Sequence, residues 1–313
     1  MQELLILFLA LGIDIIFGEP PEKFHPTVWM GKVSRRLSSS IQIGSPRSEL
    51  VQGSFLAIIV IAIFSIASLA IIEISRLILG LLAYILCSAI ILKTTFAIKS
   101  LRNHVLPILY AIQEGSTEKA RMPLQKVVRR DVNRLDEQQI ISAAVETVAE
   151  GLVDGIASPL FYFGIFGVSG AVAYRAINTL DSMVGYRERR YEYVGKFSAK
   201  MDTIANFIPA RLVAFLIIVS AAILREDWQN AWRILKRDHA KTQSVNAGWS
   251  MAAVAGALNV QLEKPQYYIL GDRRASMTAV HMAKALRIMY VATTLFVVLI
   301  ILPIIALTGV FSN

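Results

Sequence analysis

The sequence predicts an all-α, polytopic integral membrane protein with about five to seven membrane-embedded helices, some of them re-entrant, joined by helical cytoplasmic loops. Of its 313 residues, 55% are hydrophobic and 18% charged, against about 45–50% and about 25% in soluble domains. The apolar residues form blocks near the roughly 20 residues that cross a bilayer, at Phe55–Ile72, Leu77–Leu92 and Met289–Leu307. We expect one membrane-embedded domain over residues 1–313, with polar, cytoplasmic segments at 19–53, 99–154, 174–206 and 225–284.

The chain is basic: 32 Lys and Arg against 23 Asp and Glu give a formal net charge of +9. In a soluble protein this excess would suggest nucleic acid as a partner. In a membrane protein, basic residues gather in cytoplasmic loops and meet anionic lipid. We therefore expect a multi-pass protein of the cell membrane, embedded in the lipid bilayer and binding no nucleic acid. Cys87 is the only cysteine, which excludes a disulfide within the chain.

The N-terminal third predicts a helix, a loop and a hairpin. Residues 1–18 lack a basic start and a small-residue cleavage site, so they predict a retained helix and not a signal peptide. Asp14 would cost about 3 kcal/mol at mid-membrane, so we expect it to face protein. Residues 19–53 predict an irregular loop with one short helix near Trp29–Leu37. The next two apolar blocks predict a membrane hairpin, joined around Glu73–Arg76.

The middle of the chain mixes polar helices with short apolar blocks. We expect a basic helix over Thr117–Val132, and a capping box of Asp136 and Gln139 that begins the next helix. Strict alternation of crossings would place one of the basic loops, 174–206 or 225–284, outside, against the positive-inside tendency. Either Ile156–Ala173 is re-entrant or Val245–Val260 also dips into the membrane. The sequence leaves both open.

Three polar clusters adjoin apolar segments, and the first is acidic. Glu146, Glu150 and Asp154 lie at i, i+4 and i+8 on one predicted helix face. Like charges at this spacing destabilise a helix by about 0.2–0.5 kcal/mol per pair. A metal ion, a basic partner or a cationic substrate would relieve this cost. The alternative is a solvated acidic face.

The second cluster places Tyr174, Asn178 and Asp181 on one stripe of a helix, with Arg175 beside them. Asn and Asp oxygens are hard ligands that suit Mg²⁺. Arg175 could form a bidentate contact with a phosphate. The alternative is a helix end that is capped by polar residues.

The third cluster is Asp202 and Asn206, at i and i+4, just before Arg211. An arginine that enters an apolar run is costly unless it is paired, and Asp202 or Asn206 is the candidate partner. A structural pairing and a catalytic role both remain open.

Two smaller groups lie elsewhere. His25 could be a base or a phosphate contact, or only a structural residue, and the turn with Ser244 and Asn246 could offer backbone N–H groups to a phosphate. The sequence contains no Walker A, H-E-x-x-H, G-x-S-x-G or G-x-G-x-x-G motif. An ATP site, if present, is therefore not of the Walker A type.

These motifs, in this order, resemble a known family over nearly the whole chain. They are Asp14-x-x-x-Gly18-Glu19-Pro20, His25-Pro26, Arg130–Val132, Ala144–Glu150, Asp154-Gly155, Ser158–Phe161, Tyr174–Arg187, Asn206–Arg211, Asn246–Gly248 and Ala255–Leu258. The sequence is similar to the adenosylcobinamide-phosphate synthases of cobalamin biosynthesis, the CobD/CbiB family. It departs from the family pattern at Gly151, usually Asn, at Thr203, usually Asp, at Arg129, usually Gly, and at Thr242–Val245, usually His-Pro-Ser-Pro.

The resemblance implies an ATP-dependent amide ligase that uses Mg²⁺, with its active site facing the cytoplasm. It would join adenosylcobyric acid to (R)-1-amino-2-propanol or its O-phosphate, giving adenosylcobinamide or its phosphate. The free and the phosphorylated amine both stay open, as do a homo-oligomer and an association with other membrane enzymes of the corrinoid pathway. A membrane transporter and a non-catalytic membrane sensor of the same fold are the alternatives.

The resemblance and the clusters together define the predicted site. The predicted catalytic residues are Glu146, Glu150, Asp154 and Asp181. The predicted metal ligands are Asp181, Asn178, Glu150 and Asp202. The predicted substrate and phosphate contacts are His25, Arg130, Tyr174, Arg175, Asn178, Arg187, Asn206, Arg211, Ser244 and Asn246.

Overall fold

The computed structural model describes residues 1–41, 44–184 and 193–311. Helices make up nearly all of its regular structure, which confirms the all-α prediction, and one short hairpin supplies the strands in these ranges. The chain divides into two compact units. Unit 1 comprises Met1–Ala97, Ser158–Ala205 and Ile300–Asn313, and unit 2 comprises Ile98–Ala157 and Asn206–Leu299.

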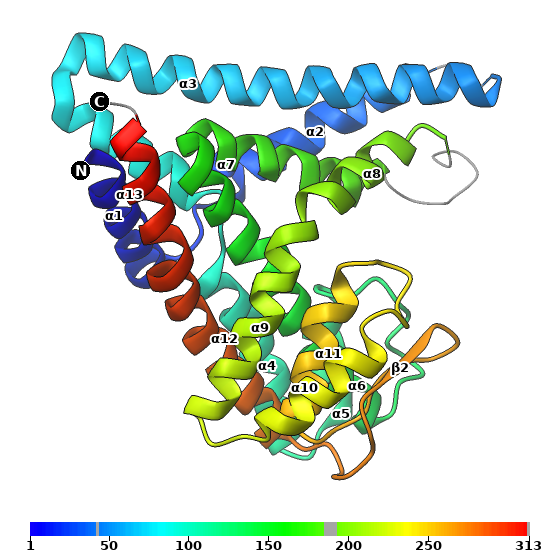
Figure 1. The fold of residues 1–313 in the computed structure, drawn as a ribbon. Coiled ribbons are helices and arrows are strands. Elements are labelled where there is room, and N and C mark those ends of the chain that lie inside the picture. Colours follow the sequence, from blue (N-terminus) through cyan, green and yellow to red (C-terminus); the bar gives the residue numbers. More distant parts are fainter. Residues whose placement is uncertain (42–43, 185–192, 312–313) are drawn as a thin grey trace. The chain divides into compact units, whose positions relative to one another are not determined.

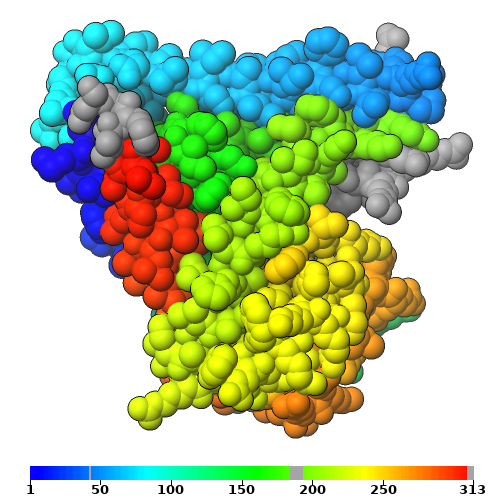
Figure 2. Space-filling model, viewed as in Figure 1, coloured from blue at the N-terminus to red at the C-terminus, as the bar shows by residue number. Residues whose placement is uncertain are grey.

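In unit 1 a long helix packs along several shorter ones. Its elements are α1 (Gln2–Phe17), the 3₁₀-helix η1 (Glu22–Phe24), α2 (Pro26–Ser39), α3 (Pro46–Lys93), α7 (Ser158–Val184), α8 (Lys196–Ala205) and α13 (Leu302–Phe311). The first part of α3 runs across α2, α7 and α8 (Figure 1). Its buried face repeats at helical spacing through Gly53, Leu56 and Val60. Phe55 and Ile59 on the other face are exposed, and the outer side of α3 lies open at the surface in Figure 2.

Glycines break the two longest helices of unit 1. Gly80 in α3 has φ 81° and Gly167 in α7 has φ 68°, a region that glycine adopts without a steric cost. The expected hairpin joint at Glu73–Arg76 is therefore wrong, because the helix continues through it and breaks at Gly80. Within residues 19–53 the short helix expected near Trp29–Leu37 is confirmed as α2 (Pro26–Ser39), but the irregular part is shorter than expected, because α3 already begins at Pro46.

Unit 2 surrounds one short apolar helix. Its elements are α4 (Ile98–Gln113), α5 (Thr117–Gln125), α6 (Glu137–Leu152), the π-helix η2 (Val153–Ala157), α9 (Phe207–Ile223), α10 (Trp228–Asp238), α11 (Ala247–Ala257), β1 (Leu262–Lys264), β2 (Tyr268–Leu270), α12 (Ala279–Phe296) and the π-helix η3 (Val297–Ile301), which runs into unit 1. Helix α11 packs against α6, α9 and α10, and nearly all of its residues are buried. At about 1.5 Å per residue it is too short to cross a bilayer. Small side chains allow this close packing.

The helices in the middle of the chain begin and end partly where the sequence predicts. The capping box of Asp136 and Gln139 is confirmed. The basic helix expected to reach Val132 ends at Gln125, because the chain folds back and Arg121 donates to the Val132 carbonyl. The helix expected to carry Tyr174, Asn178 and Asp181 is confirmed, since α7 continues to Val184, and the polar segment becomes helical again in α8 from Lys196.

Three helical stretches are long and apolar enough to cross a membrane, by length and composition, within the described residues. They are Pro46–Gln113, Glu137–Met183 and Ala279–Thr308. A fourth follows if Lys196–Ala205 and Phe207–Ile223 form one broken span. The number is below the expected five to seven because neighbouring apolar blocks join into single helical runs, and because α1 has only 16 residues. These helices support a membrane protein.

Candidate functional site

One polar cavity of unit 2 lies between α6, the β1–β2 hairpin and the segment that follows α5. It has a volume of about 390 Å³, near the lower end of the roughly 300–1,000 Å³ typical of small-molecule sites. It is lined by Val127, Val128, Arg129, Arg130, Ala143, Glu146, Thr147, Glu150, Lys264, Tyr267 and Tyr268. The structure therefore brings together three of the predicted site residues, Arg130, Glu146 and Glu150.

Glu146 is buried and both of its carboxylate oxygens are occupied. Oε2 accepts from Arg130 Nη2 at 3.1 Å and from Tyr268 Oη at 2.8 Å. Oε1 accepts from Ser142 Oγ at 2.6 Å. A buried carboxylate with an ion pair and two hydroxyl donors is compensated for its lost hydration. Glu146 is thus suited to hold Arg130 and Tyr268 in place.

Glu150 lies one turn further along α6 and is exposed to the cavity. The hairpin places Lys264 in the same cavity, with its ammonium 4.8 Å from the centre of the Tyr267 ring. A carboxylate and a cation therefore both line a small cavity. Such a lining can bind a ligand that carries both an amine and an anionic group.

The phenol of Tyr268 remains a hydrogen-bond donor in this environment. Burial raises the pKa of Tyr268, and the negative charges of Glu146 and Glu150 raise it further. The protonated phenol can therefore keep donating to Glu146 across the neutral pH range. This fixes the hairpin side chain to helix α6.

Asp154, the third acid of the predicted stripe, does not line this cavity. Helix α6 ends at Leu152 and a π-helical turn covers Val153–Ala157. A π-turn has more residues per turn than an α-helix, so it shifts the stripe out of register. The prediction of one face through Asp154 is wrong for this reason.

In unit 1, part of the second cluster meets the third. Arg175 Nη1 donates to Asn178 Oδ1 at 3.3 Å, and Asn178 Nδ2 donates to Asp202 Oδ1 at 3.2 Å. Tyr174 is buried, with its ring stacked on Tyr162 at 5.4 Å between centroids. The amide oxygen of Asn178 therefore faces a guanidinium.

The predicted metal ligands fall in different units, with Glu150 in unit 2 and Asn178, Asp181 and Asp202 in unit 1. Across the described ranges no three His, Cys, Asp or Glu side chains lie together in a way that could hold a metal ion. Mg²⁺ in proteins is often held by one or two carboxylates together with substrate phosphates. Glu150 fits that arrangement, and the magnesium site stays a prediction. Arg187 lies outside the described residues.

Arg211 has other partners than the two proposed from the sequence. Its Nη1 donates to Asn246 Oδ1 at 3.2 Å and to the Phe207 carbonyl at 2.6 Å. Its guanidinium lies 3.4 Å from the centre of the Phe207 ring and 4.7 Å from that of Trp249. The expected pairing with Asp202 or Asn206 is thus replaced by an amide, a carbonyl and two rings.

The turn before α11 and the start of α9 also carry predicted contacts. Ser244 Oγ accepts from the backbone N–H groups of Asn246 and Ala247, at 3.3 and 3.2 Å. These two donors therefore satisfy a side chain within the turn. Asn206 is buried at the N-cap of α9.

His25 belongs to a buried ionic network in unit 1. Lys93 Nζ lies 3.1 Å from Asp14 Oδ1 and 3.0 Å from Glu19 Oε1, and His25 Nε2 lies 2.7 Å from Glu19 Oε2. The N–H of Thr27 donates to His25 Nδ1 at 3.3 Å, so Nε2 carries the proton and donates to Glu19. Both ring nitrogens are engaged, which suits a structural role. Burial raises the pKa of Glu19, but His25 and Lys93 lower it below its ordinary value overall.

The comparisons identify the family. The family model described as "CobD/Cbib protein" matches residues 7–302. The chain belongs to the CobD/Cbib family. It is 45% identical to the cobalamin biosynthesis protein CobD of Dehalococcoides mccartyi, over 87% of this chain and 88% of that one. It is 41% identical to the probable cobalamin biosynthesis protein CobD of Thermoplasma volcanium, over 98% and 99% of the two chains. No solved structure matches the chain.

Membership of the CobD/Cbib family supports a role in cobalamin biosynthesis. Two departures from the resemblance can be placed in the structure. Thr203 is exposed and its hydroxyl donates to the Ala199 carbonyl at 2.8 Å. Gly151 faces Leu101, and a Cβ on it would lie 2.7 Å from Leu101 Cδ2. A glycine at position 151 therefore leaves room for Leu101.

Replacing Gly151 with Asn, the residue that the family resemblance led us to expect here, should destabilise the protein by about 1–3 kcal/mol, because it overpacks this contact. The clash involves the end of a leucine side chain, so shortening that side chain should relieve it. Thermal unfolding in detergent would measure both effects. Two double variants that both carry Leu101→Ala are compared, one with Gly151→Asn and the other with Gly151→Ala. If the first is no more stable than the second, the asparagine side chain gains nothing from the space that the shortened Leu101 leaves.

Sequence reasoning missed Lys264, Tyr268, Glu19 and Lys93. The signal for Lys93 was available: a lysine that ends an apolar run needs a partner, and Asp14 in the first helix needs one too. Nothing in the sequence pointed to Lys264 or Tyr268. Both lie on a hairpin that is far along the chain from Glu146.

Proposed function

We propose that the protein is an ATP-dependent amide ligase of cobalamin biosynthesis, which joins adenosylcobyric acid to (R)-1-amino-2-propanol or its O-phosphate. The observation that carries this proposal is the unit 2 cavity, in which Glu150 and Lys264 line a small volume beside the Arg130–Glu146 pair. Family membership supports the pathway, and the cavity supports the amine-binding half of the reaction.

The cavity suits the amine component better than the corrin component. Its volume of about 390 Å³ fits a short molecule, whereas a corrin ring with its side chains and adenosyl group is larger than a drug-sized ligand. Glu150 can bind the ammonium and accept its proton before the nitrogen attacks. Lys264 and Arg130 can meet the oxygen end of the ligand, whether it is a hydroxyl or a phosphate.

ATP and Mg²⁺ belong to the proposal through the family resemblance. If Mg²⁺ is bound, the chemistry that it would supply is positive charge to offset that of the phosphates during activation of the carboxyl group. The candidate protein ligands are Asn178, Asp181 and Asp202 in unit 1 and Glu150 in unit 2, and Glu150 serves the amine where the unit 1 residues hold the ion. Arg175 and Arg211 are proposed to hold phosphates or the corrin propionate.

The proposed location is the cell membrane, with the active site on the cytoplasmic side, where ATP is available. The candidate spans support a membrane protein. The proposal includes two forms of assembly, a homo-oligomer and an association with other membrane enzymes of the corrinoid pathway. The orientation can be tested by labelling single cysteines placed at Glu118 and Glu137, after replacing Cys87, in intact and opened cells.

The proposed activity is tested by a conversion assay on the detergent-purified protein. Adenosylcobyric acid, Mg-ATP and either amine are supplied, and the corrinoid mass is followed by chromatography and mass spectrometry. A product heavier by the amine minus water, formed only with ATP, would support the ligase. Folded protein that gives no product with either amine would contradict it. Uptake of a corrinoid into liposomes without conversion would then favour the transporter.

A further inference from the structure

The β1–β2 hairpin brings distant residues to the cavity of unit 2. The strands pair antiparallel, with Lys264 opposite Tyr268, and both side chains line the cavity. On the α6 side the hairpin is held by the N–H of Glu263, which donates to Ser142 Oγ at 2.8 Å. Arg130 Nη1 also donates to the Glu263 carbonyl at 3.2 Å. The position of the hairpin therefore decides whether Lys264 and Tyr268 line the cavity.

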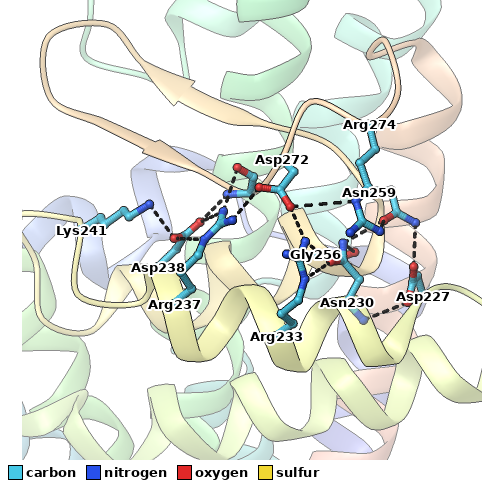
Figure 3. Close-up of polar contacts among 11 residues, drawn as sticks. Asp227, Asn230, Arg233, Arg237, Asp238, Lys241, Gly256, Asn259, Asp272 and Arg274 are labelled. Atoms are coloured by element: carbon cyan, nitrogen blue, oxygen red, sulfur yellow. Dashed lines mark hydrogen bonds and ion pairs between the residues drawn. The ribbon is translucent and has the colours of Figure 1, made fainter.

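The other end of the hairpin is attached to helix α10 by an ionic cluster (Figure 3). Asp272, two residues after β2, pairs with Arg233 and, through Oδ1 at 2.6 Å, with Arg237 Nη1. The two arginines are four residues apart, so they project from the same face of α10. Asp272 also lies 3.9 Å from Arg274 Nε. One carboxylate thus joins the hairpin exit to two side chains of α10.

Asp238 on α10 completes this attachment. Its Oδ2 accepts from the backbone N–H of Gly271 at 2.8 Å. Burial would raise the pKa of the Asp238 carboxyl, but hydrogen bonds from Arg237, Lys241 and Gly271 lower it to about 2. Hydrogen bonds from Arg237 and Arg233 likewise lower the pKa of Asp272. Both carboxylates are therefore charged at neutral pH, and the cluster is fully ionised.

The backbone at this point has little freedom. Gly271 has φ 84°, and a Cβ on it would lie 2.2 Å from the Val260 carbonyl oxygen. The chain leaving β2 thus passes directly against the chain entering β1. A change in the Asp272 contacts is therefore transmitted to the hairpin and not absorbed by a loose loop.

We infer that Asp272 is a positioning residue for the cavity, which acts through the hairpin to hold Lys264 and Tyr268 at the ligand site. Asp272 itself does not line the cavity. This inference rests on the proposed function for its kinetic test. It adds a residue, outside the cavity and outside the family motifs quoted above, on which ligand affinity depends.

The inference makes a kinetic prediction that differs from a purely structural role. Without its contacts at Asp272, the hairpin occupies the correct position in only a fraction of molecules. The apparent affinity falls by that fraction, and a saturating ligand restores the position. Asp272→Asn is therefore expected to raise the KM for the amine about five- to tenfold while kcat stays within about twofold.

Salt and rescue experiments separate positioning from stability. The Asp272 pairs are partly exposed, with 30% of the aspartate side chain accessible, so salt screens them. The wild-type KM should rise with added NaCl more steeply than the KM of Asp272→Asn, because salt screens the ligand's own charged contacts in both proteins but the Asp272 pairs only in the wild type. Asp272→Glu should recover part of the affinity. If Asp272 acts through Tyr268, the two substitutions should not be additive. Asp272→Asn should then raise the KM less in the Tyr268→Phe background than in the wild type.

Glu226→Gln is the matched control, because it removes another ion pair of unit 2, to Lys284 at 2.8 Å, and neither of these residues lines the cavity. It should leave the KM unchanged. A wild-type KM and salt dependence in Asp272→Asn, with or without a lower melting temperature, would overturn the inference. If the wild type shows no turnover, the proposed function fails instead. Hydrogen exchange of residues 262–270 then decides: faster exchange in Asp272→Asn supports the inference, and equal exchange overturns it.

Discussion

Glu150→Gln is expected to lower kcat/KM for amide formation by about 10²–10⁴-fold, the usual contribution of a general acid–base group. Glutamine keeps the size of the side chain and its hydrogen-bonding capacity but cannot accept a proton from the amine or balance its charge. Glu150 is the carboxylate that the structure leaves exposed to the cavity in unit 2. The conversion assay on purified protein measures this loss.

The fold should survive this substitution. Glu150 lies four residues after Glu146 on α6, and like charges at this spacing destabilise a helix by about 0.2–0.5 kcal/mol. Removing one charge should therefore leave the melting temperature unchanged or slightly higher. Glu137→Gln, on the exposed first turn of the same helix, is the matched control and should keep full activity.

Glu146→Gln distinguishes the structural role of Glu146 from the proposed catalytic role of Glu150. Its carboxylate compensates the partly buried Arg130 and receives two hydroxyl donors, so neutralising it should lower stability and activity together. Near-normal turnover in Glu150→Gln, with activity lost only in Glu146→Gln, would assign the base to Glu146 and reject our assignment. Asp181→Ala, in unit 1, is also expected to abolish turnover while leaving the protein folded in the membrane.

The sequence was sufficient for the helical fold but not for its breaks. Apolar blocks and the capping box at Asp136 have local causes, so they could be predicted. The break at Gly80 could not, because a glycine within an apolar run is compatible with both a continuous helix and a positive φ. The hairpin lacked a signal as well. Its turn has Gln266 at φ 67°, where an Asn-Gly or Asp-Gly pair would have predicted it.

The part of the candidate site that has a local cause in the sequence was predictable as well. The stripe of Glu146 and Glu150 follows from helical spacing, and Arg130 follows from the family motif. The placement of Lys264 and Tyr268 depends on a contact between α6 and a hairpin more than 100 residues later, as in the bond from Tyr268 to Glu146. Spacing along one helix cannot reveal such a contact. Asp154 was misplaced because a π-turn changes the period that the prediction assumed.

The buried network around Lys93 supports a second large effect, on stability. Lys93→Met is expected to destabilise the protein by about 3–5 kcal/mol, the usual cost of breaking a buried ion pair from one side. The Lys93 side chain is 3% exposed and Asp14 is 0% exposed, so the Asp14 carboxylate left behind could not be hydrated. The network joins α1, the segment after it, the start of α2 and the end of α3 within unit 1. Its loss should therefore loosen all four.

Thermal unfolding in detergent measures this effect, with Lys32→Met as the control on the exposed side of α2. If the cost comes from uncompensated charge, neutralising the acids should reverse it. The triple variant Lys93→Met, Asp14→Asn, Glu19→Gln is expected to recover much of the lost stability, because a neutral set of similar shape needs no ion pair. A triple variant as unstable as Lys93→Met alone would instead assign the loss to the packing and hydrogen bonds of the lysine side chain. In all of these variants the N–H of Thr27 still donates to His25 Nδ1. The contact of His25 that changes is therefore the one between Nε2 and position 19.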